Sequence, residues 1–270
     1  MSLKVAKDYW PIWRRLDNKP MKNFCHTVFL LLCFGLLASC GSNTQSRTGK
    51  PVTTEVQDSI SVEEAVAPVA FQAEDTLCYH GYVFASQPIP EEVRARMQGK
   101  SMKDKANIGY DDLRYLTLYY YDFDNHIQQG EMVCNKAIAH DLLCIFKTLF
   151  MEAYPIYSIR LVDDFDASDE ASMQANNSSC FNYRTIAGSH KLSRHAFGMA
   201  VDINPLQNPC IRGTRIRPST ATDFVDRSKD FPHKIDDNDL CKKTFESHGF
   251  RWGGRWRSVK DYQHFEKKMK

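Results

Sequence analysis

The sequence predicts an α+β fold, a single domain in which a central antiparallel sheet is flanked by helices. Two observations indicate this class. After residue 114 of the 270-residue chain, runs rich in β-branched and aromatic residues are mixed with runs of helical periodicity. These runs lack the regular strand–helix–strand repeat that a parallel α/β sheet requires. Mixed elements without that repeat favour strands that pair antiparallel.

The first expected strand covers residues 115–123, where YLTLYYYDF is rich in aromatic and β-forming residues. Asp124-Asn125 and Gln128-Gln129-Gly130 then supply turn chemistry. Apolar residues recur at helical spacing from residue 138 to 149, which predicts a helix with one apolar face, and Pro155 closes it.

The remaining expected elements are short. Residues 163–179, DDFDASDEASMQANNSS, are polar and predict a loop. We expect strands at residues 156–162, 199–203 and 262–265, and a helix over residues 237–247 that Gly249 caps.

The N-terminus resembles a targeting signal. A basic stretch precedes an apolar run over residues 24–38, which is shorter than the ~20 residues of a membrane-spanning helix. The run ends in LASCG, which resembles the bacterial lipobox, where the cysteine is lipidated. We therefore expect residues 1–40 to be a lipoprotein signal peptide and Cys40 to carry lipid. The alternatives are an ordinary transmembrane anchor or a buried helix.

Residues 41–76 are rich in Ser, Thr, Gln, Glu and Val and show no sustained periodicity. We interpret them as a disordered tether, which as a flexible coil would span roughly 30–35 Å root-mean-square. A folded domain over residues 77–270 would then be held at the bacterial cell envelope, anchored by lipid to a membrane outside the cytoplasm.

Charge excludes one class of partner. Without the first 40 residues, which carry six Lys/Arg and two Asp/Glu, the chain has 29 basic and 31 acidic residues. Nucleic-acid binding needs a concentrated basic surface, so no nucleic-acid partner is expected. We expect a monomer.

Six cysteines fall in the expected domain. An even number in an exported domain permits disulfides, and six cysteines allow fifteen pairings among which the sequence does not choose. None of them forms a CxxC pair, so a cysteine zinc cluster is not expected. They are Cys78, Cys134, Cys144, Cys180, Cys210 and Cys241.

The candidate chemistry lies in residues 193–202, SRHAFGMAVD. A turn of small residues that leads into a strand can bring His195 and Asp202 to one side of a sheet. Near the C-terminus, Asp261-Tyr-Gln-His264 offers a second histidine with an acid three residues before it. Two histidines and one carboxylate would leave a zinc ion one open position for water, as in catalytic rather than structural sites.

The pattern SxHxxGxAxD with a late (E/D)xxH resembles the zinc D-alanyl-D-alanine carboxypeptidases and L-alanyl-D-glutamate endopeptidases of bacterial walls and phage lysins. The resemblance extends over residues 115–265. It implies a hedgehog/DD-peptidase-like fold, a zinc peptidase domain over residues 77–270, one Zn²⁺ ion and peptidoglycan peptides as substrates. It includes NKAI at 135–138, YPI at 154–156, RLVDD at 160–164 and GFRWGG at 249–254.

The same resemblance assigns roles to single residues. His195, Asp202 and His264 would bind zinc, and Asp261 would be the general base. Aspartate at that position resembles the endopeptidase-leaning branch. Arg184, within Asn-Tyr-Arg, matches the arginine that meets the substrate's carbonyl or terminal carboxylate, although a plain salt bridge also accounts for it.

Three functions remain open. The first is a wall peptidase, cutting either a terminal D-alanine or a bond inside the stem peptide. The second is a non-catalytic, zinc-containing lipoprotein that binds the cell wall, as relatives of the hedgehog signalling type suggest. The third is a lipoprotein in which zinc only holds the fold together. An open coordination position and a base at Asp261 favour the enzyme.

Overall fold

The computed structural model describes residues 76–268, and these residues form the predicted α+β fold. The strands are divided among four sheets instead of one central sheet, and three of the four are antiparallel. The strands of the C-terminal half have only two or three residues each, so the sheets that they form are small. The signal and the tether expected before residue 76 lie outside the described residues.

The largest sheet is antiparallel, with strand order β1-β2-β3-β4. Its two long strands pair in continuous register from Leu113↔Asn135 to Tyr121↔Ile127. The strand expected over residues 115–123 is therefore confirmed, shifted by two residues. The strands are β1 (Thr76–Tyr79), β2 (Tyr82–Gln87), β3 (Leu113–Tyr121) and β4 (Ile127–Asn135), and the short helix α1 (Glu91–Met97) follows β2.

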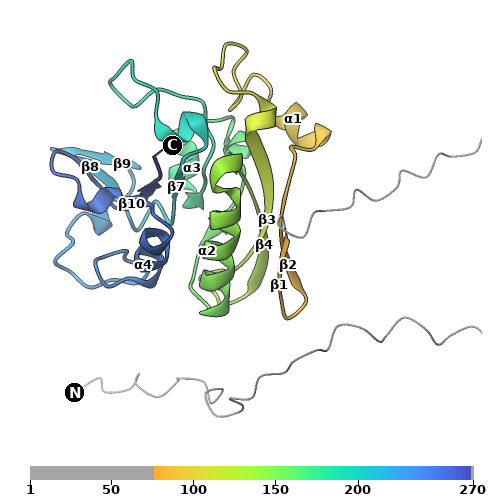
Figure 1. Ribbon diagram of the computed structural model, residues 1–270. Coiled ribbons are helices and arrows are strands. Elements are labelled where there is room, and N and C mark those ends of the chain that lie inside the picture. The colour runs from red at the N-terminus through yellow and green to blue at the C-terminus, as the bar shows by residue number, and fades with distance from the viewer. Residues whose placement is uncertain (1–75, 269–270) are drawn as a thin grey trace, which may run out of the picture. The chain divides into compact units, whose positions relative to one another are not determined.

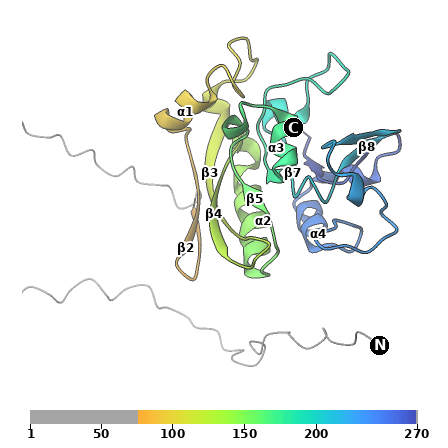
Figure 2. The same cartoon turned by 180° about the vertical axis from the view of Figure 1, so that it is seen from behind.

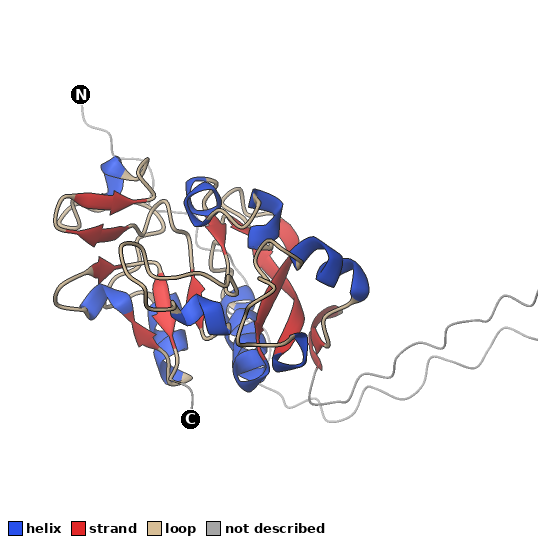
Figure 3. Cartoon of the chain, turned by 90° about the horizontal axis from the view of Figure 1, so that it is seen from above, coloured by secondary structure: helices blue, strands red, loops and turns tan. Residues whose placement is uncertain are grey.

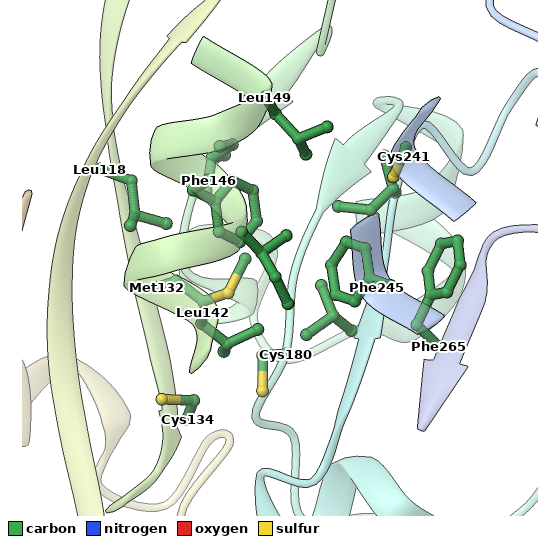
Figure 4. Packing of buried hydrophobic residues seen from close by; sticks show 14 of the residues in the cluster. Leu118, Met132, Cys134, Leu142, Phe146, Leu149, Cys180, Cys241, Phe245 and Phe265 are labelled. Carbon is green, nitrogen blue, oxygen red and sulfur yellow. The ribbon is translucent and has the colours of Figure 1, made fainter. Parts of the chain in front are cut away.

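Helix α2 (Ala139–Met151) covers one face of this sheet (Figure 1). Its apolar residues at positions 142, 145, 146 and 149 are fully buried, as the helical spacing predicts. In Figure 4, Leu118 and Met132 of the sheet lie next to Phe146 of the helix. The helix ends before Ala153, which has a positive φ of 49°, and Pro155 follows.

Residues 128–130 are not a turn, contrary to the prediction. They lie in β4, and the turn is formed by residues 122–126, where Asn125 has a φ of 63°. Gly130 serves close packing within the strand: a Cβ there would lie 2.6 Å from Cβ of Ile159. The glycine therefore admits a neighbouring segment.

Residues 163–179 contain more structure than the expected polar loop. They hold most of η4 (Val162–Phe165), the helix α3 (Asp169–Gln174) and the strand β6 (Asn177–Ser178), which pairs in parallel with β5 (Ser158–Ile159). Ser168 caps α3 by accepting a hydrogen bond from the Ala171 amide. The strand expected over residues 156–162 is reduced to β5, because Leu161 and Val162 lead into η4.

A second sheet lies on the other side of α2, as the view from behind also shows (Figure 2). Helix α4 packs beside it, and the ring of Phe245 stacks on that of Phe265 at 4.3 Å. Figure 4 shows these two rings across the core from Phe146. The strand order is β10-β12-β7, with β7 (Ala200–Asp202), α4 (Leu240–Ser247), β10 (Arg251–Trp252) and β12 (His264–Glu266). The strands expected at residues 199–203 and 262–265 and the helix at 237–247 are thus present in shortened form.

A small third sheet, of order β11-β8-β9, completes the C-terminal half. Viewed from above, its strands lie at the edge of the molecule away from the large sheet (Figure 3). The strands are β8 (Cys210–Arg212), β9 (Arg215–Arg217) and β11 (Lys260–Asp261). The remaining 3-10 turns are η2 (Tyr110–Asp112), η3 (Lys136–Ile138), η5 (Arg194–Phe197), η6 (Thr222–Phe224) and η7 (Gly253–Arg255).

The six cysteines of the described residues are free thiols, so the disulfides that the sequence permits are not formed. Burial raises the pKa of Cys134 and Cys180, which keeps both protonated. Between residues 76 and 268, no helix has the length and apolar character needed to cross a membrane.

One backbone contact joins the large sheet to the turn that carries His195. The Asn135 amide at the end of β4 donates to the Gly198 carbonyl at 2.9 Å, and its side-chain amide donates to the Phe197 carbonyl at 3.0 Å. Gly198 has a φ of 62°, and a Cβ there would lie 2.5 Å from the Asn135 nitrogen. Only glycine fits this conformation and this approach.

We therefore expect Gly198→Ala to destabilise the protein far more than Gly213→Ala. Both glycines have positive φ, 62° and 58°, but a Cβ at Gly213 would meet nothing within 4 Å. The control should lose about 1–2 kcal/mol, the cost of a left-handed residue, and Gly198→Ala about 3 kcal/mol or more. Urea unfolding followed by tryptophan fluorescence measures both. Equal losses would show that the approach to Asn135 does not matter.

Candidate metal centre

Three of the residues that the sequence singled out come together in the C-terminal half. His195 lies on η5, Asp202 on β7 and His264 on β12. Asp202 and His264 stand directly opposite each other in the antiparallel pairing of their strands. Each of the three residues offers one potential ligand atom, and these three atoms lie within 4.8 Å of one another. All three side chains are buried.

Local capping places His195. The Ser193 hydroxyl accepts a hydrogen bond from the His195 amide, which begins η5, and Gly198 ends η5 in the left-handed conformation. His195 Nδ1 then lies 2.6 Å from the Cys180 carbonyl oxygen. Because that oxygen can only accept, Nδ1 carries a proton, and Nε2 is the nitrogen that faces the other two side chains.

The lone pairs of the site converge. His195 Nε2 lies 3.2 Å from Asp202 Oδ2, and His264 Nδ1 lies 3.0 Å from Asp202 Oδ1. The two imidazoles approach each other at 3.2 Å between the same nitrogens. On the far side of its ring, His264 Nε2 lies 3.6 Å from Glu266 Oε2, which favours a proton on Nε2. Two imidazole nitrogens and a carboxylate facing one point form a donor set suited to a metal cation.

Protons on the histidines balance the negative charge of Asp202. Burial lowers the pKa of His264, but the hydrogen bonds to Asp202 and Glu266 outweigh it and raise that pKa to about 10. Burial alone would raise the pKa of Asp202, yet the charge of His195 and the hydrogen bonds from both histidines hold it well below its usual range. A metal ion would replace the proton on His264 Nδ1, because metal ligands must be deprotonated.

Asp261 stands at the edge of this group. Its strand β11 pairs with β8, which places Asp261 opposite Cys210. Its Oδ1 atom is inaccessible to solvent and has no hydrogen-bond partner among the described residues. Burial raises the pKa of Asp261 to about 6, against the opposing charge of His264. A carboxylate with an unused oxygen and a pKa near neutrality is suited to accepting a proton.

Gly253 lies directly behind Asp261 and His264. A Cβ at this position would lie 2.9 Å from Cβ of Asp261 and 3.3 Å from Cβ of His264. The small residue therefore allows η7 to pack against both strands that carry the two side chains. The GFRWGG segment contains this glycine, so its packing role explains part of that motif.

These side chains line one cleft of about 480 Å³. Trp256 lines this cleft, with its ring 5.2 Å from that of His264. Trp252 is buried in the core instead. The volume falls in the range of small-ligand sites.

Arg184 lies in the wall of the same cleft and has no contact with the two histidines among the interactions of the described residues. Its guanidinium forms an ion pair with Asp169 Oδ1 at 2.6 Å, and its Nε atom is buried without a hydrogen-bond partner. Arg184 therefore lies near the site, and it also forms a salt bridge, which was the alternative explanation for this arginine.

Sequence reasoning missed three neighbours of the site. Glu266 could have been found, because it lies two residues after His264 and therefore on the same face of a strand. The carbonyl of Cys180, which faces His195, and the thiol of Cys210, which is hydrogen-bonded to Asp261, gave no signal, because each reaches the site through tertiary pairing.

A second group of potential ligands, Asp122, Asp124 and His126, lies in the turn between β3 and β4. There, Asp122 Oδ1 accepts hydrogen bonds from the Asp124 and His126 amides at 3.0 and 2.8 Å. This carboxylate stabilises its own turn, and two members of the group are exposed.

Comparison with known protein families gives one match. Residues 187–267 match the sequence model of a peptidase family described as D-alanyl-D-alanine carboxypeptidase. The matched segment contains His195, Asp202, Asp261 and His264, whereas Arg184 precedes it. Comparison with curated proteins and with solved structures gave no match.

The purified protein should retain one divalent transition-metal ion per chain. His195→Ala and His264→Ala should each reduce the metal content nearly to zero, because each removes a donor from a three-residue set. Elemental analysis after gel filtration measures this. His248→Ala is the control, since His248 faces Asp141 outside the site at 3.3 Å and its loss should leave the metal in place. Unchanged metal in both site variants would refute the ligand set.

Proposed function

We propose that this protein is a zinc-dependent peptidase that hydrolyses peptide bonds in the D-amino-acid-containing stem peptides of bacterial peptidoglycan. It would act as a D-alanyl-D-alanine carboxypeptidase or as an L-alanyl-D-glutamate endopeptidase. The observation that carries the proposal is the convergence of His195, Asp202 and His264 beside the carboxylate of Asp261. The family match over residues 187–267 supports the same reaction class.

The donor set fits zinc. Two imidazoles and one carboxylate are a set that catalytic zinc sites use, and they leave a coordination position open. Zinc, when bound, supplies a Lewis acid that polarises a carbonyl and lowers the pKa of water. Cys180 and Glu266 would keep the two histidines in the orientation that binding requires, since each faces the ring nitrogen away from the site.

Asp261 is the proposed general base. Its carboxylate would take the proton of the attacking water and later give it to the leaving amine. Burial raises the pKa of Asp261 to about 6, which makes its carboxylate a stronger proton acceptor than that of an exposed aspartate.

Arg184 is the proposed contact for the substrate's carbonyl or terminal carboxylate. Asp169 holds its guanidinium from one side at 2.6 Å. A guanidinium has five N–H donors, so further donors remain for a ligand in the cleft. The ion pair would then orient Arg184 for substrate.

We also propose that the protein acts at the bacterial cell envelope, anchored through lipid on Cys40. The basic flank, the short apolar run and the LASC sequence support this proposal. Peptidoglycan would be within reach of a domain tethered there.

Asp261→Asn should keep the metal and lose turnover. The substitution preserves shape but removes the proton acceptor, so kcat on a D-alanine-containing muropeptide should fall about a hundred- to ten-thousand-fold. Mass spectrometry of the products and elemental analysis of the enzyme measure the two effects. Asp223→Asn, at an exposed position outside the cleft, is the matched control and should change neither.

Two results would contradict this assignment. Wild-type turnover by Asp261→Asn would show that another group is the base. A metal-loaded wild-type protein that cleaves none of the muropeptides tested would favour the non-catalytic wall-binding lipoprotein.

Lipidation is tested separately. Intact-mass analysis of detergent-extracted protein from its native host should show an acylated Cys40 at a new N-terminus, with residues 1–39 removed. Cys40→Ala should abolish the acyl mass. An unprocessed N-terminus on the wild-type protein would contradict the signal-peptide interpretation.

A further inference from the structure

The hairpin formed by β8 and β9 presents arginines to the cleft. Arg212 and Arg215 stand directly opposite each other across its tip, on either side of Gly213 and Thr214. Like charges in such a pair repel, which makes the arrangement unfavourable for folding alone. Neither arginine has an ion-pair partner among the described residues, although both line the cleft.

Strand geometry places these arginines on the same face as Asp261. Alternate residues of a strand share a face, so Cys210 and Arg212 lie on one side of β8. Their register partners Asp261, Arg217 and Arg215 lie on that side too. Cys210, Arg212, Arg215, Arg217 and Asp261 all line the cleft, whereas Ile211 and Ile216, which alternate with them, do not.

The hairpin is fixed at its base. Arg217 Nη2 lies 2.8 Å from Asp169 Oδ2, and Arg217 Nε lies 3.4 Å from Glu170 Oε2. The backbone pairing of β8 with β11 ties the other strand to Asp261. Arg212 is two residues along β8 from the partner of Asp261, a rise of about 7 Å. This distance corresponds to about two residues of an extended peptide.

Besides Asp261, three acids line the cleft, and all three are already engaged. Asp169 pairs with Arg184 and Arg217, and Asp202 lies between the two histidines. Glu266 pairs with Arg251 at 2.8 Å. Lys191 and Arg194 also line the cleft, and neither has an ion-pair partner among the described residues. The cleft therefore has an excess of positive charge at its rim.

We propose that Arg212 and Arg215 bind free carboxylates of the substrate about two residues from the scissile bond, so that the cleft prefers acidic stem peptides over amidated ones. This inference rests on the proposed function and adds the substrate's charge to it. A peptide is the favoured ligand because the arginines and the metal ligands line one cavity of about 480 Å³, so a single short chain would contact both. Bidentate binding by arginine is specific for carboxylate over carboxamide.

The test compares two synthetic stem peptides that are identical except that their side carboxylates are free in one and amidated in the other. Purified full-length, zinc-loaded protein should cleave the free form with a kcat/KM at least about tenfold higher, the size expected for one charge-assisted hydrogen bond. In the double variant Arg212→Gln/Arg215→Gln, the ratio of the two kcat/KM values should fall toward one. Higher salt should reduce the wild-type ratio as well.

The matched control is Lys147→Gln/Lys243→Gln, which removes two positive charges from α2 and α4, outside the cleft. It should keep the wild-type ratio, which separates local recognition from net charge. Thermal unfolding and metal content should show that the arginine variant folds, and each single arginine variant gives a second measurement. A smaller decrease is expected in each.

The outcomes separate the two proposals. Equal cleavage of both peptides by the wild-type protein would overturn the preference and leave the peptidase intact. If neither peptide is cleaved, the peptidase proposal fails. The preference for free carboxylates is then tested by measuring the binding of the two peptides by calorimetry. Tighter binding of the free form that Arg212→Gln/Arg215→Gln abolishes would support it, and equal binding would overturn it.

Discussion

The site depends on how closely η5 approaches the end of β4. The amide of Asn135 reaches the carbonyl of Gly198 at 2.9 Å, a distance that no residue with a Cβ at position 198 would permit without displacing backbone. This contact holds the turn of His195 against the large sheet, one face of which α2 covers. The long strands of the large sheet are thereby joined to the part of the domain that consists of short strands. His195 takes its position from that support, together with the Cys180 carbonyl.

The other two candidate ligands are positioned by a different element, the pairing of β7 with β12. The register His264↔Asp202 sets their side chains on one face at adjacent positions. Burying two histidines and a carboxylate together is unfavourable unless protons or a cation balance the charge. The cluster therefore contributes little to the stability of the fold, whereas it is well suited to binding a cation. The outer contacts with Cys180 and Glu266 are consistent with that use.

Local patterns predicted local elements. The apolar spacing of α2, the aromatic run of β3 and the small residues before Asp202 each led to an element or a site that the structure contains. Helix α3 was missed although Ser168 is a local cap signal for it, but most of the other failures had tertiary causes. Gly130 looks like a turn residue in sequence, but it serves packing against Ile159. The arginines of the β8–β9 hairpin carried no signal, because only pairing with β11 places them beside Asp261. The candidate ligands could be named from the sequence because they fit a family pattern. The ion pair of Arg184 with Asp169 could not, because it depends on the position of α3 in the fold.

The pairing of β7 with β12 has a consequence for how this domain can change. Asp202 and His264 are 62 residues apart in sequence, yet their relative position is fixed by a few ladder hydrogen bonds. The β8–β9 hairpin lies between them in sequence and pairs with neither β7 nor β12. The entropic cost of closing such a loop grows only slowly with its length. The tip of the hairpin can therefore be lengthened, shortened or exchanged while the ligands keep their places, which lets the domain diversify in what it recognises without rebuilding its metal centre.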